Sequence, residues 1–541
     1  MSATTVQRTG GALPTVRRIT VYVLLFALVS LTAAGTSGLI AIVLGGSTEN
    51  RGSALAQSLA FVLVAGPLSW LLWRSLAKRL LEPAEHTAPA WGLYVAALYT
   101  AALIVASISL LSVLADVITG HPGPWQERVG LALAWGAVWW WQARLWHHPR
   151  RAPQTLATLP GILGNWYGLA LAWGALAAAL ASLFTAAIAS LASAAAFGTP
   201  WFTAPLAQLP WLAGGLLIWW WHFARERVGV LRGGFADVAL VVGGVLVAAA
   251  ATLGGCGVTI HALLRFAFGS GMPALQVIPA ALATALSGAL VWAFHHKVLR
   301  ESLAPVRTAA RLVLSGIGLA AAASGLGIVI NAALAGSSRQ LSGYTAGDLL
   351  LAGLVSLVLG AALWVPAWRP DRAADPRGRR VYLVAVFGIS AAVALVALLV
   401  IGFRIFEHLF DAANADSGLL ESVRAPLGLL VATVLAAGYH FIIWGGDRAV
   451  LDTEISEHPG TLESLVLVAG GDTAGLRQLL VRLTGARVEV MAVAGVPGVP
   501  PPDEAALASA LAGIGPAARR VMLLIDGPTE LRIIELEQSS R

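Results

Sequence analysis

Three side chains that could bind an ion or a ligand lie close together near the end of a long apolar segment. Arg404, Glu407 and His408 are spaced by three and four positions, so all three can share one face of a helix. Ionisable groups at membrane depth often mark an ion or substrate path. However, an apolar helix that begins at Val381 reaches the far interface within about 20 residues, before Arg404. We therefore predict that these charges lie outside the hydrocarbon, with a ligand or ion role as the alternative.

Two histidines, His222 and His295, occupy equivalent positions at the ends of two apolar segments. A metal site needs several ligands that converge with suitable geometry, and no spacing in this chain specifies one. The pattern favours anchoring at the membrane interface over ligand or ion binding. The sequence shows no catalytic carboxylate pair, no nucleophile–base pair and no cofactor motif. We therefore predict no catalytic residue, cofactor or metal, and an enzyme is the least favoured class.

The composition identifies the solvent in which this chain folds. Of the 541 residues, 57% are hydrophobic and only 12% are charged. Soluble domains carry about 25% charged residues, so most of this apolar surface must face a lipid bilayer. The net charge of +7 could indicate a nucleic-acid partner, but helix orientation accounts for it and we expect no nucleic acid. The single Cys256 excludes an intramolecular disulfide.

Twelve segments are long enough to span a membrane, which takes roughly 20 apolar residues. The first apolar run, from Ile19 to Leu44, is too long for the core of a cleaved signal peptide, usually about 7–15 residues. Pro67, Pro205, Pro279 and Pro426 fall in or beside even-numbered segments, and they could mark broken helices or simple kinks. The segments are 19–45, 54–73, 91–115, 128–146, 166–195, 203–223, 236–265, 275–297, 308–335, 347–368, 381–410 and 424–444.

The even-numbered segments end alike, in aromatic residues followed by basic ones. Trp and Tyr prefer the membrane interface, and Lys and Arg anchor the cytoplasmic side. The motif recurs every 70–80 residues, which predicts six tandem two-helix units. We predict these interfacial anchors: Trp70, Trp73, Trp139, Trp140, Trp141, Trp219, Trp220, Trp221, Trp292, Trp364, Trp368 and Trp444.

The basic residues orient these units. Of the 35 Lys and Arg residues, 22 fall on the side of the two termini, 6 on the opposite side and 7 after residue 450. The excess predicts that both termini are cytoplasmic. Because each unit has two helices, all units enter the membrane in the same orientation, as parallel repeats. The predicted units are about 17–80, 89–151, 163–228, 236–300, 307–370 and 379–448, within a transmembrane domain 19–445 that follows a cytoplasmic tail 1–18.

The composition changes after Trp444, where a polar linker 446–460 leads to a cytoplasmic α/β domain at 461–541. Strands are predicted at 463–468, 487–494, 520–525 and 530–536, and helices at 473–483 and 503–511. The last two strands form a hairpin. The turn Gly470-Gly-Asp-Thr473 could hold an anion, but it lacks a phosphate-loop or dinucleotide motif, so we predict a tight turn with Asp472 as the N-cap.

The Arg18-x-x-x-Tyr22 opening and the aromatic-plus-basic endings resemble a family of bacterial integral membrane proteins described only as a domain of unknown function, built from repeated two-to-four-helix units. The resemblance covers residues 17–448 and implies no activity or binding residue. The sequence therefore predicts an all-α multi-pass protein of a bacterial inner membrane. Our first hypothesis is a scaffold or signalling protein whose domain at 461–541 binds a cytoplasmic protein. The alternative is a transporter or channel for a small or lipidic substrate. The sequence leaves the oligomeric state open.

Overall fold

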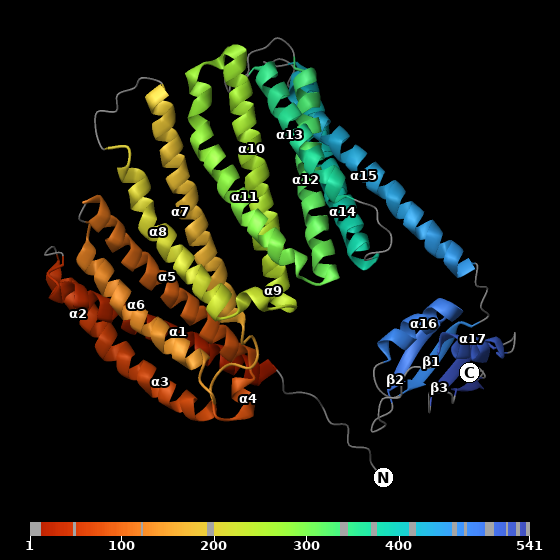
Figure 1. Cartoon of the computed structure of the whole chain (residues 1–541), viewed down its shortest axis with the longest axis horizontal. Coiled ribbons are helices and arrows are strands. Elements are labelled where there is room, and N and C mark those ends of the chain that lie inside the picture. The colour runs from red at the N-terminus through yellow and green to blue at the C-terminus, as the bar shows by residue number, and fades with distance from the viewer. Residues whose placement is uncertain are drawn as a thin grey trace. The chain divides into compact units, whose positions relative to one another are not determined.

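The computed structural model describes residues 12–46, 50–120, 123–191, 200–335, 345–368, 376–410, 418–456, 462–469, 473–492, 503–514, 518–525 and 531–536. Its contacts divide the chain into two compact units, Met1–Ala437 and Gly438–Arg541, and the division falls within one long helix. Figure 1 shows long helices in the first unit and a small sheet in the second.

Long helices make up the first unit. They are α1 (Ala12–Val43), α2 (Arg51–Ala60), α3 (Gly66–Arg79), α4 (Pro83–His86), α5 (Pro89–Thr119), α6 (Trp125–Trp146), α7 (Leu159–Leu191), α8 (Thr203–Trp220), α9 (Gly234–Ala239), α10 (Ala248–Arg265), α11 (Ile278–Arg300), α12 (Ala304–Ala333), α13 (Ala346–Ala367), α14 (Pro376–Phe410) and α15 (Leu419–Ser456). Shorter helical turns are η1 (Phe61–Ala65), η2 (Trp221–Arg225), η3 (Val228–Val230), η4 (Leu240–Val247), η5 (Phe266–Ser270) and η6 (Met272–Val277).

Ten helical segments of the described chain are long and apolar enough to cross a membrane. They correspond to ten of the twelve predicted segments, which shows a multi-pass integral membrane protein. The other two predicted segments fold as α6 and α8, and neither is among the ten. Both are rich in Trp, whose indole N–H is polar and lowers the apolar character of the helix.

Two helices extend beyond the membrane segments predicted for them. The helix α1 begins at Ala12, inside the tail predicted at 1–18. The helix α15 continues to Ser456 through most of the linker predicted at 446–460. In both places the composition becomes polar without breaking the helix, because polar residues such as Arg, Glu and Asp cost a helix only a few tenths of a kcal/mol each. The next proline after α15 is Pro459, just beyond its end.

The helix that runs from Arg51 to Arg79 stays continuous across Pro67. A π-helical turn, η1, precedes the proline, which lies in the first turn of α3. Proline has no backbone N–H to donate, and a wider turn accommodates the missing bond. In this helix the proline therefore modifies the helical turn and does not separate two half-helices.

Close backbone contact joins α12 to α13, which lie beside each other in Figure 1. A methyl group at Gly325 would lie 2.3 Å from the backbone nitrogen of Leu357, and one at Gly360 would lie 2.3 Å from that of Ala322. Only glycine permits such an approach. Small residues favour helix association in lipid, where the hydrophobic effect does not drive it.

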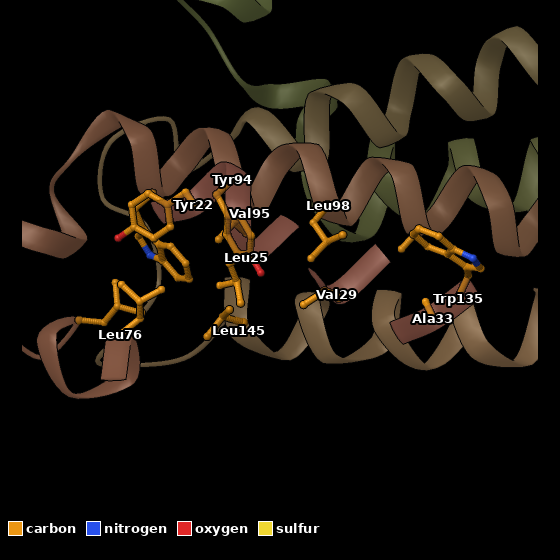
Figure 2. Close-up of a cluster of buried hydrophobic side chains, with 13 residues drawn as sticks. Tyr22, Leu25, Val29, Ala33, Leu76, Tyr94, Val95, Leu98, Trp135 and Leu145 are labelled. Atoms are coloured by element: carbon orange, nitrogen blue, oxygen red, sulfur yellow. The ribbon is translucent and has the colours of Figure 1, made fainter. Parts of the chain in front are cut away.

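The first hairpins enclose an aromatic core, drawn in Figure 2. Tyr22 lies at one end of this cluster, followed along α1 by Leu25, Val29 and Ala33. The rings of Tyr22 and Trp91 lie with centroids 5.5 Å apart, a distance typical of favourable aromatic pairs. The cluster fixes the position of α1 against α5 and α6.

Hydrogen bonds join the beginnings of odd-numbered predicted segments to the loops that follow even-numbered ones. The indole nitrogen of Trp91, at the start of α5, donates to the carbonyl oxygen of Arg151 at 2.9 Å, beyond the end of α6. The hydroxyl of Thr155 donates to the carbonyl oxygen of Thr87. A further contact joins two such loops, because His147 Nε2, after α6, lies 3.0 Å from Glu226 Oε2, beyond the end of η2. We call this side, which also carries the basic loops, the basic end.

The second unit contains a mixed four-stranded sheet with the order β2-β1-β3-β4. The strands β1 and β2 pair in parallel, as do β1 and β3, whereas β3 and β4 form the predicted antiparallel hairpin. Its elements are β1 (Ser464–Ala469), α16 (Ala474–Thr484), β2 (Arg487–Ala492), α17 (Glu504–Ala512), β3 (Arg520–Ile525) and β4 (Leu531–Glu535).

Alternating apolar residues build the core of this sheet. Leu465, Leu467 and Leu523 are fully buried, together with Leu480 of α16 and Leu507 of α17. Period-two alternation on a strand puts one set of side chains on one face, which the helices then cover. The predicted N-cap Asp472 lies outside the described residues, and Thr473 occupies the N-cap position of α16.

Candidate functional site

A cavity of about 840 Å³ lies between α12, α14 and α15. Binding pockets for small molecules typically enclose about 300–1,000 Å³. The wall from α12 runs from Ala309 to Ser324, which corresponds to about 22 Å of helix. The cavity is therefore long and follows the helix axes, over most of the roughly 30 Å thickness of a bilayer hydrocarbon.

Small residues on three helices leave this space open. The α12 wall includes Gly316 and Ala320, and Ala385 of α14 and Ala432 of α15 face the same cavity. Beside the cavity, α12 and α15 come into backbone contact, because a methyl group at Gly428 would lie 2.2 Å from the carbonyl oxygen of Gly327. The small side chains away from this contact do not fill the gap between the helices.

Only four side chains of the cavity wall are polar, Ser324, Tyr382, Ser390 and Thr433, and two of their hydroxyls are already bonded within the protein. The hydroxyl of Tyr382, at the start of α14, lies 2.8 Å from the hydroxyl of Ser315 on α12. The hydroxyl of Thr433 donates to the carbonyl oxygens of Leu429 and Leu430 on its own helix. A ligand therefore meets a largely hydrocarbon wall, which suits an alkyl chain better than an ion.

His222 is buried at the basic end, with 1% of its surface exposed. Its Nδ1 lies 2.7 Å from the carbonyl oxygen of Ile218, which can only accept, so Nδ1 carries the proton. In the neutral ring Nε2 then accepts from the hydroxyl of Tyr99 at 2.8 Å. The ring also fills the space above Gly164 of α7, where a methyl group would lie 2.3 Å from Nε2.

His295 has the same setting one hairpin later. It is 3% exposed, and its Nδ1 donates to the carbonyl oxygen of Val291 at 2.8 Å. The ring packs on Gly244 of η4 and stacks on Trp166 of α7, with centroids 5.3 Å apart. Both histidines therefore connect neighbouring helices. The described residues contain no group of three His, Cys, Asp or Glu side chains placed to hold a metal.

Arg404 and Glu407 share a helix face, as their spacing predicts. Arg404 Nη1 lies 2.7 Å from Glu407 Oε2, and both side chains are almost half exposed. His408 lies in the same turn of α14. Within the described part of the chain, no hydrogen bond or ion pair connects these three residues with His222 or His295. The predicted ligand candidates thus do not form one site.

The predicted tryptophan anchors differ in exposure. Trp70, Trp140, Trp220 and Trp221 are between 41% and 56% exposed, as expected for side chains at a lipid interface. The guanidinium of Arg144 lies 3.7 Å from the centre of the Trp140 ring. The remaining anchors are less exposed, and Trp368 is buried at 6%.

Sequence reasoning missed the polar contacts at the end opposite the basic end. The Nε of Arg265 on α10 donates to Asp348 Oδ1 of α13 at 2.7 Å. Asp348 also accepts from the backbone nitrogen of Thr345, in a capping box at the start of α13. Farther along, Arg424 of α15 donates to the side chain of Asn331 on α12 at 2.9 Å. The Thr345-x-x-Asp348 spacing was the signal that could have identified Asp348.

Comparison with known families supports the predicted resemblance. The family model of a domain of unknown function, DUF5671, matches the chain twice, over residues 18–141 and 308–436. Each match covers three of the predicted segments and most of a fourth, and the two together show a repeated domain. No curated protein and no solved structure gives a significant match.

Proposed function

We propose that this chain is a bacterial inner-membrane protein with twelve transmembrane helices, arranged as six parallel two-helix units with both termini in the cytoplasm. The ten apolar helices support this arrangement, and α6 and α8 occupy the two remaining positions. Under this proposal the basic end is cytoplasmic. The contacts of Trp91, Thr155 and His147 support a common end for the loops around α5, α6 and η2.

The repeat extends through the middle of the chain in this proposal. The family matches leave residues 142–307 uncovered. This stretch holds His222 and His295, each hydrogen-bonded to the carbonyl four residues earlier and each packed on a glycine of the preceding helix. Such matching environments support two further units between the family matches.

We infer that the membrane part binds a lipidic ligand in the α12–α14–α15 cavity. The observation that carries this inference is the cavity itself. It measures about 840 Å³, its wall is mostly aliphatic, and the Tyr382 and Thr433 hydroxyls are already bonded. A path for ions or sugars would need unbonded polar groups in the wall that replace the water molecules around the ion or sugar. The lipidic form of the transporter hypothesis therefore fits the geometry better than an aqueous channel.

The scaffold hypothesis is supported by the second unit. The strand β2 stands at an edge of the sheet, with β1 on its other side. Val490 and Met491 of this strand are 37% and 57% exposed. An open strand edge with apolar side chains can accept a strand from another protein. We propose partner binding through this edge as the second function. Affinity purification with and without residues 461–541 tests it, and an unchanged set of partners would remove it.

A photo-crosslinkable fatty acid or phospholipid tests the cavity. Replacing the exposed cavity residue Ala320 with Trp fills the space, so we expect Ala320→Trp to lose most of the labelling on α12 and α14. The matched control is Ala333→Trp, because Ala333 is an exposed alanine of α12 outside the cavity. Labelling that persists in the Ala320→Trp variant would refute a ligand in this cavity.

A further inference from the structure

A second, smaller pocket of about 190 Å³ opens at the basic end, where the start of α1 meets the end of α3. Its wall carries three arginines, Arg17, Arg18 and Arg79, with Glu85 and Tyr22. Arg18 Nε lies 3.2 Å from Glu85 Oε1, so the glutamate compensates one of the three positive charges. The pocket keeps an excess of two positive charges, which suits an anionic group.

Arg17 and Arg79 are both exposed and have no ion-pair partner among the residues that the structure describes. Their side chains can therefore turn toward a bound anion without breaking an existing contact. Arginine is well suited to phosphate, because its planar guanidinium can donate two parallel hydrogen bonds.

The hydroxyl of Tyr22 supplies an independent sign of a ligand. Tyr22 is 4% exposed, lines the pocket, and its hydroxyl has no hydrogen-bond partner within the described chain. The ring is held by Trp91 and Tyr94, with centroids 5.5 and 5.6 Å away. A buried donor without a partner is costly and uncommon. A phosphate oxygen beside Arg18 would accept from this hydroxyl.

A separate apolar cavity, which we call the groove, lies farther along the same helices. The groove, of about 540 Å³ between α1, α3 and α6, is lined on α1 from Val29 to Ile40. Val29 lies seven residues after Tyr22, two helical turns along the same face. On α3, Trp73 of the groove likewise precedes Leu76 of the pocket by about one turn. The α1 wall is about 16 Å long, roughly half the thickness of the bilayer hydrocarbon.

We propose that this face of α1 and α3 binds an anionic glycerophospholipid. Its phosphate occupies the pocket of Arg17, Arg18 and Arg79 and accepts a hydrogen bond from Tyr22, and one acyl chain lies in the groove from Val29 to Ile40. The basic pocket at the helix ends suits the phosphate, and the apolar groove that begins about 10 Å farther along α1 suits the acyl chain. The site is separate from the α12–α14–α15 cavity and does not depend on it.

Native mass spectrometry of the purified full-length chain, titrated with phosphatidylglycerol or phosphatidylcholine of identical acyl chains, tests this site. The parent protein should bind the anionic lipid more tightly. The double variant Arg17→Gln/Arg79→Gln should weaken phosphatidylglycerol binding about 30-fold. The matched control Arg74→Gln/Lys78→Gln removes the same charge from α3, outside the pocket, and should keep the affinity.

A second pair of variants tests the tyrosine. Tyr22→Phe removes only the unpartnered hydroxyl and should weaken phosphatidylglycerol binding about tenfold while the protein stays folded. The matched control is Tyr94→Phe, another buried tyrosine of the same cluster, which does not line the pocket. Phosphatidylcholine binding should stay the same in both variants.

Three outcomes would overturn the proposal. The first is unchanged phosphatidylglycerol binding in the Arg17→Gln/Arg79→Gln protein. The second is an equal loss in the Arg74→Gln/Lys78→Gln control, which would assign the effect to general surface charge. The third is protection from thermal unfolding by glycerol phosphate at the same concentration as the lipid, because this would show that the anion binds without the acyl chain.

Discussion

Replacing Asp348 with Ala removes the ion pair between α10 and α13. The carboxylate makes two kinds of contact: it accepts from Thr345 at the start of its own helix at 2.9 Å, and from Arg265 Nε at 2.7 Å. The first contact is half of a capping box, and losing it costs about 1 kcal/mol. The second is a charge-assisted bond worth about 1.5–3 kcal/mol. Because the Arg265 side chain is 24% exposed and can recover some hydration, we take the lower part of this range.

The expected loss for Asp348→Ala is therefore about 3 kcal/mol in the free energy of unfolding. The matched control is Glu407→Ala, which also deletes the acid of an arginine pair. The Arg404–Glu407 pair has the same 2.7 Å separation, but its side chains are 45% and 46% exposed, and both belong to α14. Exposed pairs at this spacing contribute about 0.3–0.5 kcal/mol. The two pairs have the same N–O distance, but deleting the acid should lower the free energy of unfolding by different amounts. The Arg265–Asp348 pair is less exposed and joins two helices, whereas the Arg404–Glu407 pair lies within one.

Equilibrium unfolding of the two variants in mixed micelles measures this difference directly. Asp348→Asn provides an intermediate, because the amide oxygen can still accept from Thr345 while the charge opposite Arg265 is gone. The order of stability should be Glu407→Ala, then Asp348→Asn, then Asp348→Ala. Suppose that Glu407→Ala destabilised the protein as much as Asp348→Ala. Neither the burial of a pair nor its position between two helices would then determine how much it stabilises the protein, and the reasoning would be wrong.

Three further predictions follow from other contacts. Gly360→Ala should destabilise the α12–α13 pair by about 2 kcal/mol, because the new methyl group would lie 2.3 Å from the backbone nitrogen of Ala322. The control Gly388→Ala on α14 should be tolerated in the same unfolding assay, because no atom lies within 4 Å of the added methyl group. Tyr99→Phe should cost about 1 kcal/mol by removing the donor to His222 Nε2, and a double-mutant cycle with His222→Phe should show coupling. Leu467→Ala should destabilise the C-terminal sheet by about 2–5 kcal/mol and speed limited proteolysis after residue 460, whereas the exposed Val490→Ala should not.

The membrane class, the helical segments and the positions of the C-terminal strands are determined by local composition. An apolar run of about 20 residues has few stable alternatives to a transmembrane helix, because lipid offers no partners for backbone groups. The alternation from Leu465 to Leu467 predicts a strand in the same way. Helix ends were less predictable, since the polar residues after Trp444 are compatible with the continued α15.

The sites depended on contacts between distant residues. The sequence singled out His222, His295 and Arg404 by residue type, and the structure places the two histidines in separate helix contacts and Arg404 in an exposed pair on α14. The α12–α14–α15 cavity could not be predicted from the sequence. Its wall is mostly aliphatic, with alanine, glycine, valine, leucine and isoleucine, all of which are common throughout the chain. Only the way the three helices pack leaves a space between these side chains.

The sequence by itself determined that this is a multi-pass membrane protein with a repeated aromatic and basic motif, because hydrophobicity, aromatic position and charge act within one or two helical turns. Only the tertiary structure decided which polar groups meet and which do not. Arg265 finds Asp348 83 residues away, whereas the hydroxyl of Tyr22 is buried beside Arg18 with no partner in the described chain. Such pairings depend on how the helices pack. A donor without a partner can be recognised only when the positions of all the surrounding residues are known.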